Sequence, residues 1–408
     1  MAKAKKASNT STQKDRLAVL SSLIDEASKD SDRILVKRAN DQSVSYLLRR
    51  PTGIPSLDLA LAGGFPASST SVIAGPDGSG KDYLIWRMVA EQQRLYGDDF
   101  AMVIYQTEFP LDKKFAREFC GVQIGFTDEE LDELDKARQD NGMDPLTKEA
   151  RKEYKNQIGE IIVIQGGSAE LAFDRIIDYA ATGACQLIVV NSIGFLETEA
   201  KIAAESFQNH PQQRSEAALL KRFCTTLSNI LNLGLDGGTK QNETTIMLVD
   251  QVRAKDAAAL MGRRFVQERD KYRAASGAWA LKHGKACELV LHKGKPLRDE
   301  KNKTGPLLGR EVTWEITKGK LGTHDLKKGS YYFLFNGGAD IISDLIGLCR
   351  QYDIINVKGA WYYYQKHGFD LKANGEAALR KKIQEDPELQ KHLKDACLSA
   401  AEIAFRYR

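Results

Sequence analysis

The chain has 408 residues, of which 42% are hydrophobic and 28% are charged, and its formal net charge is +4. These values are typical of a globular protein with roughly two or three domains, and they exclude a disordered or fibrous chain. No run of about 18 apolar residues occurs, and the start lacks the apolar centre of a secretion signal, so we expect a cytoplasmic protein with no membrane partner.

Residues 1–50 combine a basic tail with one expected helix. After a small, polar and basic start, Leu17, Leu20, Ile24 and Ala27 recur at the spacing of one helix face. A helix with a single apolar stripe on an otherwise charged segment needs a surface to pack against.

Residues 51–325 alternate expected strands with helices. The apolar run 69–74 leads into a glycine-rich loop and then a helix. Further apolar, β-rich runs occur at residues 101–105, 161–165, 187–190, 244–249 and 288–292. This alternation predicts a parallel or mixed α/β sheet. The six cysteines lie far apart, mostly in apolar segments, and we expect them to be reduced core residues.

Two other segments differ from this core. The highly charged insertion 127–157 begins with Thr127 and Glu130 at the spacing of a capping box, which predicts a helical hairpin on the surface. Residues 326–408 contain an apolar helix, the aromatic cluster 359–364 and charged helices, which predicts a small α+β domain.

The glycine-rich loop has the pattern of a phosphate-binding loop. In G-x-x-x-x-G-K-[ST], glycines let backbone N–H groups surround the phosphates, the Lys reaches the outer phosphates and the hydroxyl binds magnesium. A strand before the loop and a helix after it are the context that such a site requires. The expected nucleotide-binding residues are Gly75, Pro76, Asp77, Gly78, Ser79, Gly80, Lys81, Asp82 and Tyr83.

The expected metal site departs from the usual pattern in two places. The run 187–190 has the form of a strand that ends in a magnesium-binding Asp, but Asn191 follows it, whereas Asp82 replaces the Ser or Thr of the loop. We interpret this as a transfer, in which Asp82 binds Mg²⁺ directly and Asn191 holds a coordinated water. The alternative is a site that has lost magnesium-dependent hydrolysis.

Polar residues follow two other expected strands. Glu108 comes after the run 101–105, and sites in open α/β sheets form at the carboxyl ends of strands, so Glu108 is the candidate to polarise an attacking water. A surface acid is the alternative. Gln251, after the run 244–249, is a candidate to sense the terminal phosphate.

A basic segment, residues 255–273, has the composition of a single-stranded DNA contact, because its cations alternate with apolar and aromatic side chains. A solvated charged loop is an equal alternative on composition alone. The candidate DNA-binding residues, with one from a smaller basic group upstream, are Arg214, Arg263, Arg264, Phe265, Arg269, Lys271 and Arg273.

The order of these motifs resembles the RecA family of homologous-recombination ATPases, including its phage relatives. The resemblance begins at residues 51–58, and the loop 75–81 is similar to the family's G-P-E-S-S-G-K. Gln251 and Arg253 fall on its N-Q-I-R motif, and residues 359–362 are similar to its G-A-W-Y. Agreement of several motifs in one order is highly specific.

The resemblance implies roles for individual residues. Glu108 falls on the family's catalytic glutamate, and Phe115 falls on the aromatic residue that stacks on adenine. Gln251 would couple the terminal phosphate to the second DNA-binding loop, where Arg253 would also bind DNA. Lys318 and Lys320 look like the lysines that reach the nucleotide of the neighbouring subunit. ATP and Mg²⁺ are the implied cofactors.

For the whole protein, the resemblance implies a RecA-type P-loop ATPase core with a mostly parallel central sheet, an N-terminal packing helix and a small α+β C-terminal domain. Such a protein would form a helical filament on single-stranded DNA and pair it with homologous double-stranded DNA in recombination and repair. The first helix would pack on the adjacent subunit. The expected location is the bacterial cytoplasm or nucleoid, or the interior of an infected host cell for a phage protein.

Some residues depart from the family pattern. Asp82, Asn191 and Gln106 all lie near the expected metal and water, and the insertion 127–157 has no bacterial counterpart. Two alternatives therefore stay open. One is a non-hydrolysing filament that coats single-stranded DNA, and the other is a RecA-fold helicase, which the C-terminal match disfavours.

Overall fold

The structure is a computed structural model. It describes residues 20–23, 47–203, 214–254, 272–274, 284–298, 305–323 and 327–401. Residues 20–23 are helical, and the rest of the expected N-terminal helix lies outside the described residues. Within the described ranges, no helix is long and apolar enough to cross a membrane.

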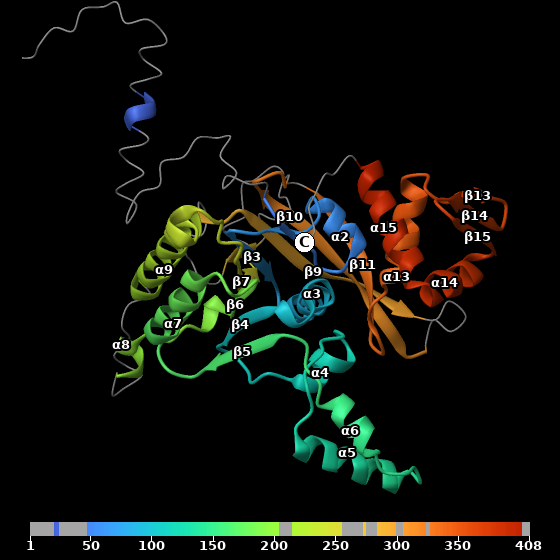
Figure 1. Cartoon of the computed structure of the whole chain (residues 1–408), viewed down its shortest axis with the longest axis horizontal. Helices are drawn as coiled ribbons and strands as arrows, with labels where there is room; N and C mark the ends of the chain where they lie inside the picture. The colour runs from blue at the N-terminus through green and yellow to red at the C-terminus, as the bar shows by residue number, and fades with distance from the viewer. Residues whose placement is uncertain are drawn as a thin grey trace, which may run out of the picture.

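One large sheet forms the centre of the molecule (Figure 1). Among the described residues it has ten strands in the order β12-β11-β10-β9-β3-β7-β6-β4-β5, with β8 paired to β7. The strands are β3 (Ser69–Gly75), β4 (Ala101–Gln106), β5 (Glu160–Gln165), β6 (Leu187–Asn191), β7 (Thr245–Ala254), β8 (Tyr272–Ala274), β9 (Cys287–Arg298), β10 (Leu307–Gly319), β11 (Lys328–Leu334) and β12 (Gly338–Ala339).

Neighbouring strands from β9 to β5 run parallel, whereas β10, β11, β12 and β8 are antiparallel to their partners. The sheet is therefore mostly parallel, and the α/β fold class is confirmed. A separate ribbon pairs β1 (Arg49–Arg50) with β2 (Phe65–Pro66).

Helices cover both faces of the sheet, which explains why its central strands read as continuous apolar runs. Along β6, Val189 packs with one cluster that includes α2 and α3, whereas Ile188 and Val190 pack with a second cluster that includes α7 and α9. The helices are α2 (Pro55–Ala60), α3 (Lys81–Tyr96), α4 (Lys113–Glu118), α7 (Ala169–Thr182), α8 (Glu199–Ile202) and α9 (Arg214–Leu233). Short 3-10 helices span Gly97–Asp99, Ile193–Phe195 and Asp236–Gly238.

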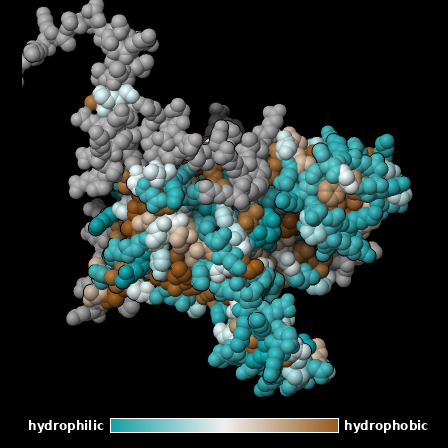
Figure 2. Space-filling view, in the orientation of Figure 1, coloured by the Kyte–Doolittle hydropathy of each residue, from teal (hydrophilic) through white to brown (hydrophobic). Residues whose placement is uncertain are grey.

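The charged insertion forms two helices, α5 (Asp128–Asp140) and α6 (Lys148–Tyr154), and the capping box expected at Thr127 and Glu130 is present. Arg151 joins the helices through ion pairs of 2.6 Å to both Asp132 and Asp135. The hairpin projects from the body, and its visible surface is mostly hydrophilic (Figures 1 and 2).

The C-terminal part has a hydrophobic core of its own and a three-stranded antiparallel sheet. Helices α13, α14 and α15 pack on one another and on this sheet. The elements are α13 (Ile341–Gln351), β13 (Asn356–Lys358), β14 (Trp361–Lys366), β15 (Phe369–Asn374), α14 (Glu376–Glu385) and α15 (Pro387–Ala400). All six cysteines are free and buried, as expected.

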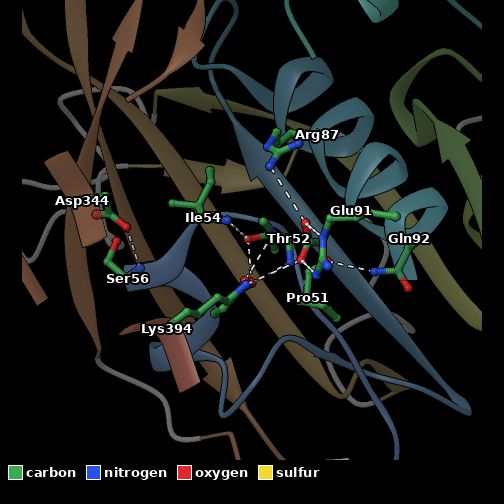
Figure 3. Close-up of polar contacts among 12 residues, drawn as sticks. Pro51, Thr52, Ile54, Ser56, Arg87, Glu91, Gln92, Asp344 and Lys394 are labelled. Atoms are coloured by element: carbon green, nitrogen blue, oxygen red, sulfur yellow. Dashed lines mark hydrogen bonds and ion pairs between the residues drawn. The ribbon is translucent and has the colours of Figure 1, made fainter. Parts of the chain in front are cut away.

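A buried polar cluster joins this C-terminal part to the core (Figure 3). Lys394 of α15 lies 2.9 Å from the fully buried carboxylate of Asp58 in α2 and 3.7 Å from Glu91 in α3. The Asp58 carboxylate also accepts hydrogen bonds from the Thr52 N–H and hydroxyl and from the Gly53 N–H. Burial alone would lower the pKa of Lys394, but the two carboxylates outweigh it and raise that pKa. The ammonium group therefore stays charged.

A second contact between the two parts is sensitive to pH. The Ser56 N–H donates to the Asp344 carboxylate at 2.7 Å, and burial raises the pKa of Asp344 to about 6. A carboxyl whose pKa is higher in the folded state binds its proton more tightly there, so it makes the fold more stable as pH falls from about 6 toward 4. Asp344→Asn is expected to remove this pH-dependent part of the stability. Unfolding curves of Asp344→Asn and of the exposed control variant Asp370→Asn, compared across that pH range, would measure the change. Equal pH profiles would contradict the assignment.

Candidate nucleotide-binding and catalytic site

The phosphate-binding loop connects β3 to α3, as the sequence predicts. Gly78 and Gly80 have φ angles of 63° and 93°, a left-handed region that glycine adopts without strain. This conformation turns the chain so that the first backbone N–H groups of α3 face the loop, where an anion can bind. The Lys81 ammonium lies over the loop and donates to the carbonyls of Gly75 and Pro76, at 3.0 and 3.2 Å.

The surroundings of Lys81 are rich in acid. Burial lowers the pKa of Lys81, and four nearby carboxylates oppose this shift. They belong to Asp82, Asp77, Glu108 and Asp250. Asp250 is buried within β7, in register with Ala74 of β3, and no motif in the sequence singles it out. A bound polyphosphate therefore needs further cations at this site.

The two unusual residues of the expected metal site are in contact. The Asn191 side-chain amide donates to Asp82 at 3.0 Å and to the Gln106 side-chain oxygen at 3.1 Å. Mg²⁺ prefers oxygen ligands and is commonly held by one or two carboxylates together with substrate phosphates and waters. Asp82, linked through the Asn191 NH2 group to the side-chain oxygen of Gln106, fits that donor set. These residues would hold the ion next to the phosphate loop.

Glu108 follows β4 and contacts residues from the two strands beyond it in the sheet, β6 and β7. Its carboxylate accepts a hydrogen bond from the Ser192 hydroxyl, which follows β6, and one of 3.2 Å from the Gln251 side chain in β7. Thr107 fixes this arrangement, because its N–H donates to the Asn191 carbonyl and its hydroxyl accepts from the Ser192 N–H. The structure thus brings together the two residues that were selected separately for water activation and phosphate sensing.

An aromatic pocket of about 260 Å³ adjoins the loop. Phe115 of α4, Phe333 and Phe335 line it together with Arg310 of β10 and residues of the loop. Such a pocket has the apolar lining and few polar groups that are typical of ligand sites, and it offers aromatic faces to a planar base.

Tyr83 belongs mostly to the core. Its side chain is buried, its hydroxyl accepts a hydrogen bond from the Ala339 N–H at 2.7 Å, and its ring meets that of Phe333 edge to face. Its ring still lines the pocket. A direct contact between Tyr83 and a nucleotide stays a prediction.

Lys318 and Lys320 lie at the opposite edge of the sheet from the loop of their own subunit. Lys318 of β10 pairs with Glu288 at the start of β9, and this start lies beside Ser71 near the beginning of β3. The phosphate loop leaves β3 at its other end, after Gly75. Burial lowers the pKa of Lys318, and the charge of Lys320 adds to this effect. The strand register therefore separates these lysines from the phosphate loop of their own subunit.

Few of the candidate DNA-binding residues are described. Arg253 and Arg273 face each other in the antiparallel pairing of β7 with β8, and Arg214 is the first residue of α9. The remaining candidates lie outside the described residues: Arg263, Arg264, Phe265, Arg269 and Lys271.

Several residues of the site were missed because they belong to no local motif. Arg310 lies in β10 and Phe335 directly follows β11, both more than 200 residues after the loop, and Ser192 stands alone after β6. Strand alternation could have grouped Arg310 with Val312 on one face, but only the sheet order places them beside the loop.

The parallel α/β sheet, the glycine loop between β3 and α3 and the polar strand ends define a P-loop protein with a RecA-type core. No family model matches the chain. Protein RecA of Francisella philomiragia is 25% identical over 379 residues, covering 92% of this chain and 88% of the relative. Protein RecA of Acinetobacter baumannii is 24% identical, covering 85% and 82%, and that of Phytoplasma mali is 23% identical, covering 93% and 94%. The chain is therefore related to the RecA proteins over most of its length.

Proposed function

We propose that the protein is an ATP-dependent DNA recombinase, which forms filaments on single-stranded DNA and promotes homologous pairing and strand exchange. The contact between Glu108 and Gln251 above the phosphate loop carries this proposal. Gln251 lies on β7, which leads directly into the basic segment, so a change at the terminal phosphate can reach that segment through one strand. The relationship to RecA proteins supports the same reading.

In the proposed reaction, ATP binds with its base in the aromatic pocket and its phosphates on the loop. Glu108 accepts a proton from the water that attacks the terminal phosphate, while Lys81 and the loop N–H groups stabilise the phosphate charge. When bound, Mg²⁺ neutralises the charge that develops on the phosphate oxygens. Asp82, Gln106 and Asn191 are the residues that would hold it.

The placement of Lys318 and Lys320 favours assembly into a filament. Because these lysines lie at the far edge of the sheet, they complete a nucleotide site only when a second subunit stacks on the first, with its loop against them. ATP would then sit between subunits and stabilise the filament. Interactions that require two subunits also link nucleotide binding to assembly on DNA.

Phosphate release, measured with and without single-stranded DNA, tests this function. We expect DNA to stimulate release and ATP to support filaments that are visible by electron microscopy. The second candidate is a filament that binds ATP without hydrolysing it, which the unusual trio of Asp82, Asn191 and Gln106 favours. Filaments that form with ATP but show no DNA-stimulated release with any metal would establish that candidate instead. A closed ring without DNA would point to a helicase.

The contact between Asp82 and Asn191 makes the metal proposal testable. Asn191→Asp alone places a second carboxylate about one hydrogen-bond length from Asp82, and Asp82→Thr alone removes the carboxylate, so each is expected to lower phosphate release. The double variant has one carboxylate and one hydroxyl at these positions. Because residues in contact are coupled, its phosphate release should exceed the value predicted by adding the losses of the two single variants. Titration of release with Mg²⁺ for all four proteins, with Asp98→Thr as an exposed control, would measure this. Additive losses would rule out the transfer.

A further inference from the structure

A second lysine of the same subunit lies against the phosphate loop. Lys293 is on β9, which runs beside β3, and its side chain reaches over Gly78. A β-carbon at Gly78 would lie 3.1 Å from the Lys293 ammonium nitrogen and 3.2 Å from the carbon that bears it. Gly78 is exposed and has a φ of 63°, so its backbone leaves room for this lysine to approach. No sequence motif includes Lys293.

The charges around the loop explain why a second cation is needed there. Asp77, Asp82, Glu108 and Asp250 all act on Lys81, which is the only cation that the loop itself supplies. The Lys81 ammonium is already shared with two loop carbonyls. A polyphosphate that enters this acidic site is repelled unless other cations offset the carboxylates.

Lys293 is suited to that role. Its residue is exposed and its ammonium group makes no ion pair with the described residues, so binding an anion requires no existing pair to break. Lys318 and Lys320 cannot replace it within one subunit, because they lie at the other edge of the sheet.

We propose that Lys293 is a phosphate-binding residue, which contacts the polyphosphate of the nucleotide from the β9 side of the loop and compensates for the acidic side chains around Lys81. This inference rests on the proposed ATP site and adds a residue to it. Because Lys293 approaches Gly78 and not Glu108, it affects nucleotide affinity more than the chemical step. It acts within one subunit, so its effect does not require a filament.

Binding of the fluorescent analogues mant-ATP and mant-ADP with Mg²⁺, measured without DNA, tests the proposal. Loss of one charge-assisted contact is expected to make the Kd of Lys293→Ala about 10-fold weaker than that of the wild type. Lys293→Gln, which keeps much of the side-chain length without the charge, should behave like Lys293→Ala, and Lys293→Arg should retain most of the affinity. Lys295→Ala, which removes an exposed lysine two residues along the same strand, is the matched control and should bind as the wild type does.

The outcomes separate the two proposals. If the wild type binds neither analogue, the ATP site itself is wrong. If the wild type binds and Lys293→Ala matches Lys295→Ala, the ATP site stands and the role of Lys293 is wrong. The proposal is supported if Lys293→Ala binds the analogues more weakly than the wild type, Lys293→Arg binds them almost as tightly as the wild type, and thermal unfolding without nucleotide is unchanged in both variants.

Discussion

Glu108→Gln is expected to lower DNA-stimulated phosphate release by about 10²- to 10⁴-fold, which is the usual contribution of a general base. The amide oxygen of the new side chain can still accept the hydrogen bonds from Ser192 and Gln251. The geometry of the site should therefore persist while the ability to accept a proton is lost. Phosphate release with single-stranded DNA, together with binding of mant-ATP, would measure the two effects separately.

The expected result is slow release with almost unchanged affinity. Glu118→Gln is the matched control, because Glu118 is an exposed acid of the adjoining helix α4 and should be replaceable without loss. A Glu108→Gln protein that releases phosphate at the wild-type rate would show that another group activates the water. Loss of nucleotide binding in that variant would show that Glu108 supports the structure of the loop.

The parts of the site that lie close together in sequence could be predicted from it. The phosphate loop is a continuous segment between a strand and a helix, so one motif determines its conformation. Glu108 and Gln251 are 143 residues apart, yet both could be selected because each follows an apolar strand. Parallel strands end at the same edge of a sheet, and this rule brings their side chains together without any knowledge of the strand order. It does not, however, give the direct contact between them.

The end of β9 could not be predicted, because tertiary pairing outweighed local signals. The apolar run suggested a strand at residues 288–292, but β9 continues to Arg298 through Gly294 and Pro296. Pairing with β10 extends it, and a register shift between Arg310 and Val312 accommodates the irregular stretch. Lys293 lies in this extension, and Arg310 of β10 pairs with Pro296 within it, so the same misjudged boundary concealed two cations near the loop.

The Asp82 and Asn191 pair illustrates an intermediate case. The sequence lacks a carboxylate at Asn191 and has an additional one at Asp82, and this opposite change in charge is the reason to connect the two positions. The structure shows their contact and adds Gln106 as a third member. Compensation between distant positions can thus be inferred from chemistry, whereas the identity of the remaining partners depends on the order of strands in the sheet.

Lys394→Met is expected to destabilise the protein by about 3–5 kcal/mol, because it leaves Asp58 buried without its cation. The Asp58 carboxylate is fully buried, and the remaining donors come from Thr52 and Gly53. Because the pKa of Lys394 is raised, its stabilising charge is present throughout the neutral range and is lost only at higher pH. Urea unfolding at pH 7, followed by circular dichroism, would measure the change.

Two further variants separate the ion pair from simple packing. Lys391→Met removes an exposed lysine of the same helix and should leave stability almost unchanged. The double variant Asp58→Asn with Lys394→Met removes both charges, so it should be considerably more stable than Lys394→Met alone. If the double variant is instead less stable by the sum of the two single effects, then the two charges are not coupled. The C-terminal part would then be held to the core mainly by its other contacts, such as the hydrogen bond between Ser56 and Asp344.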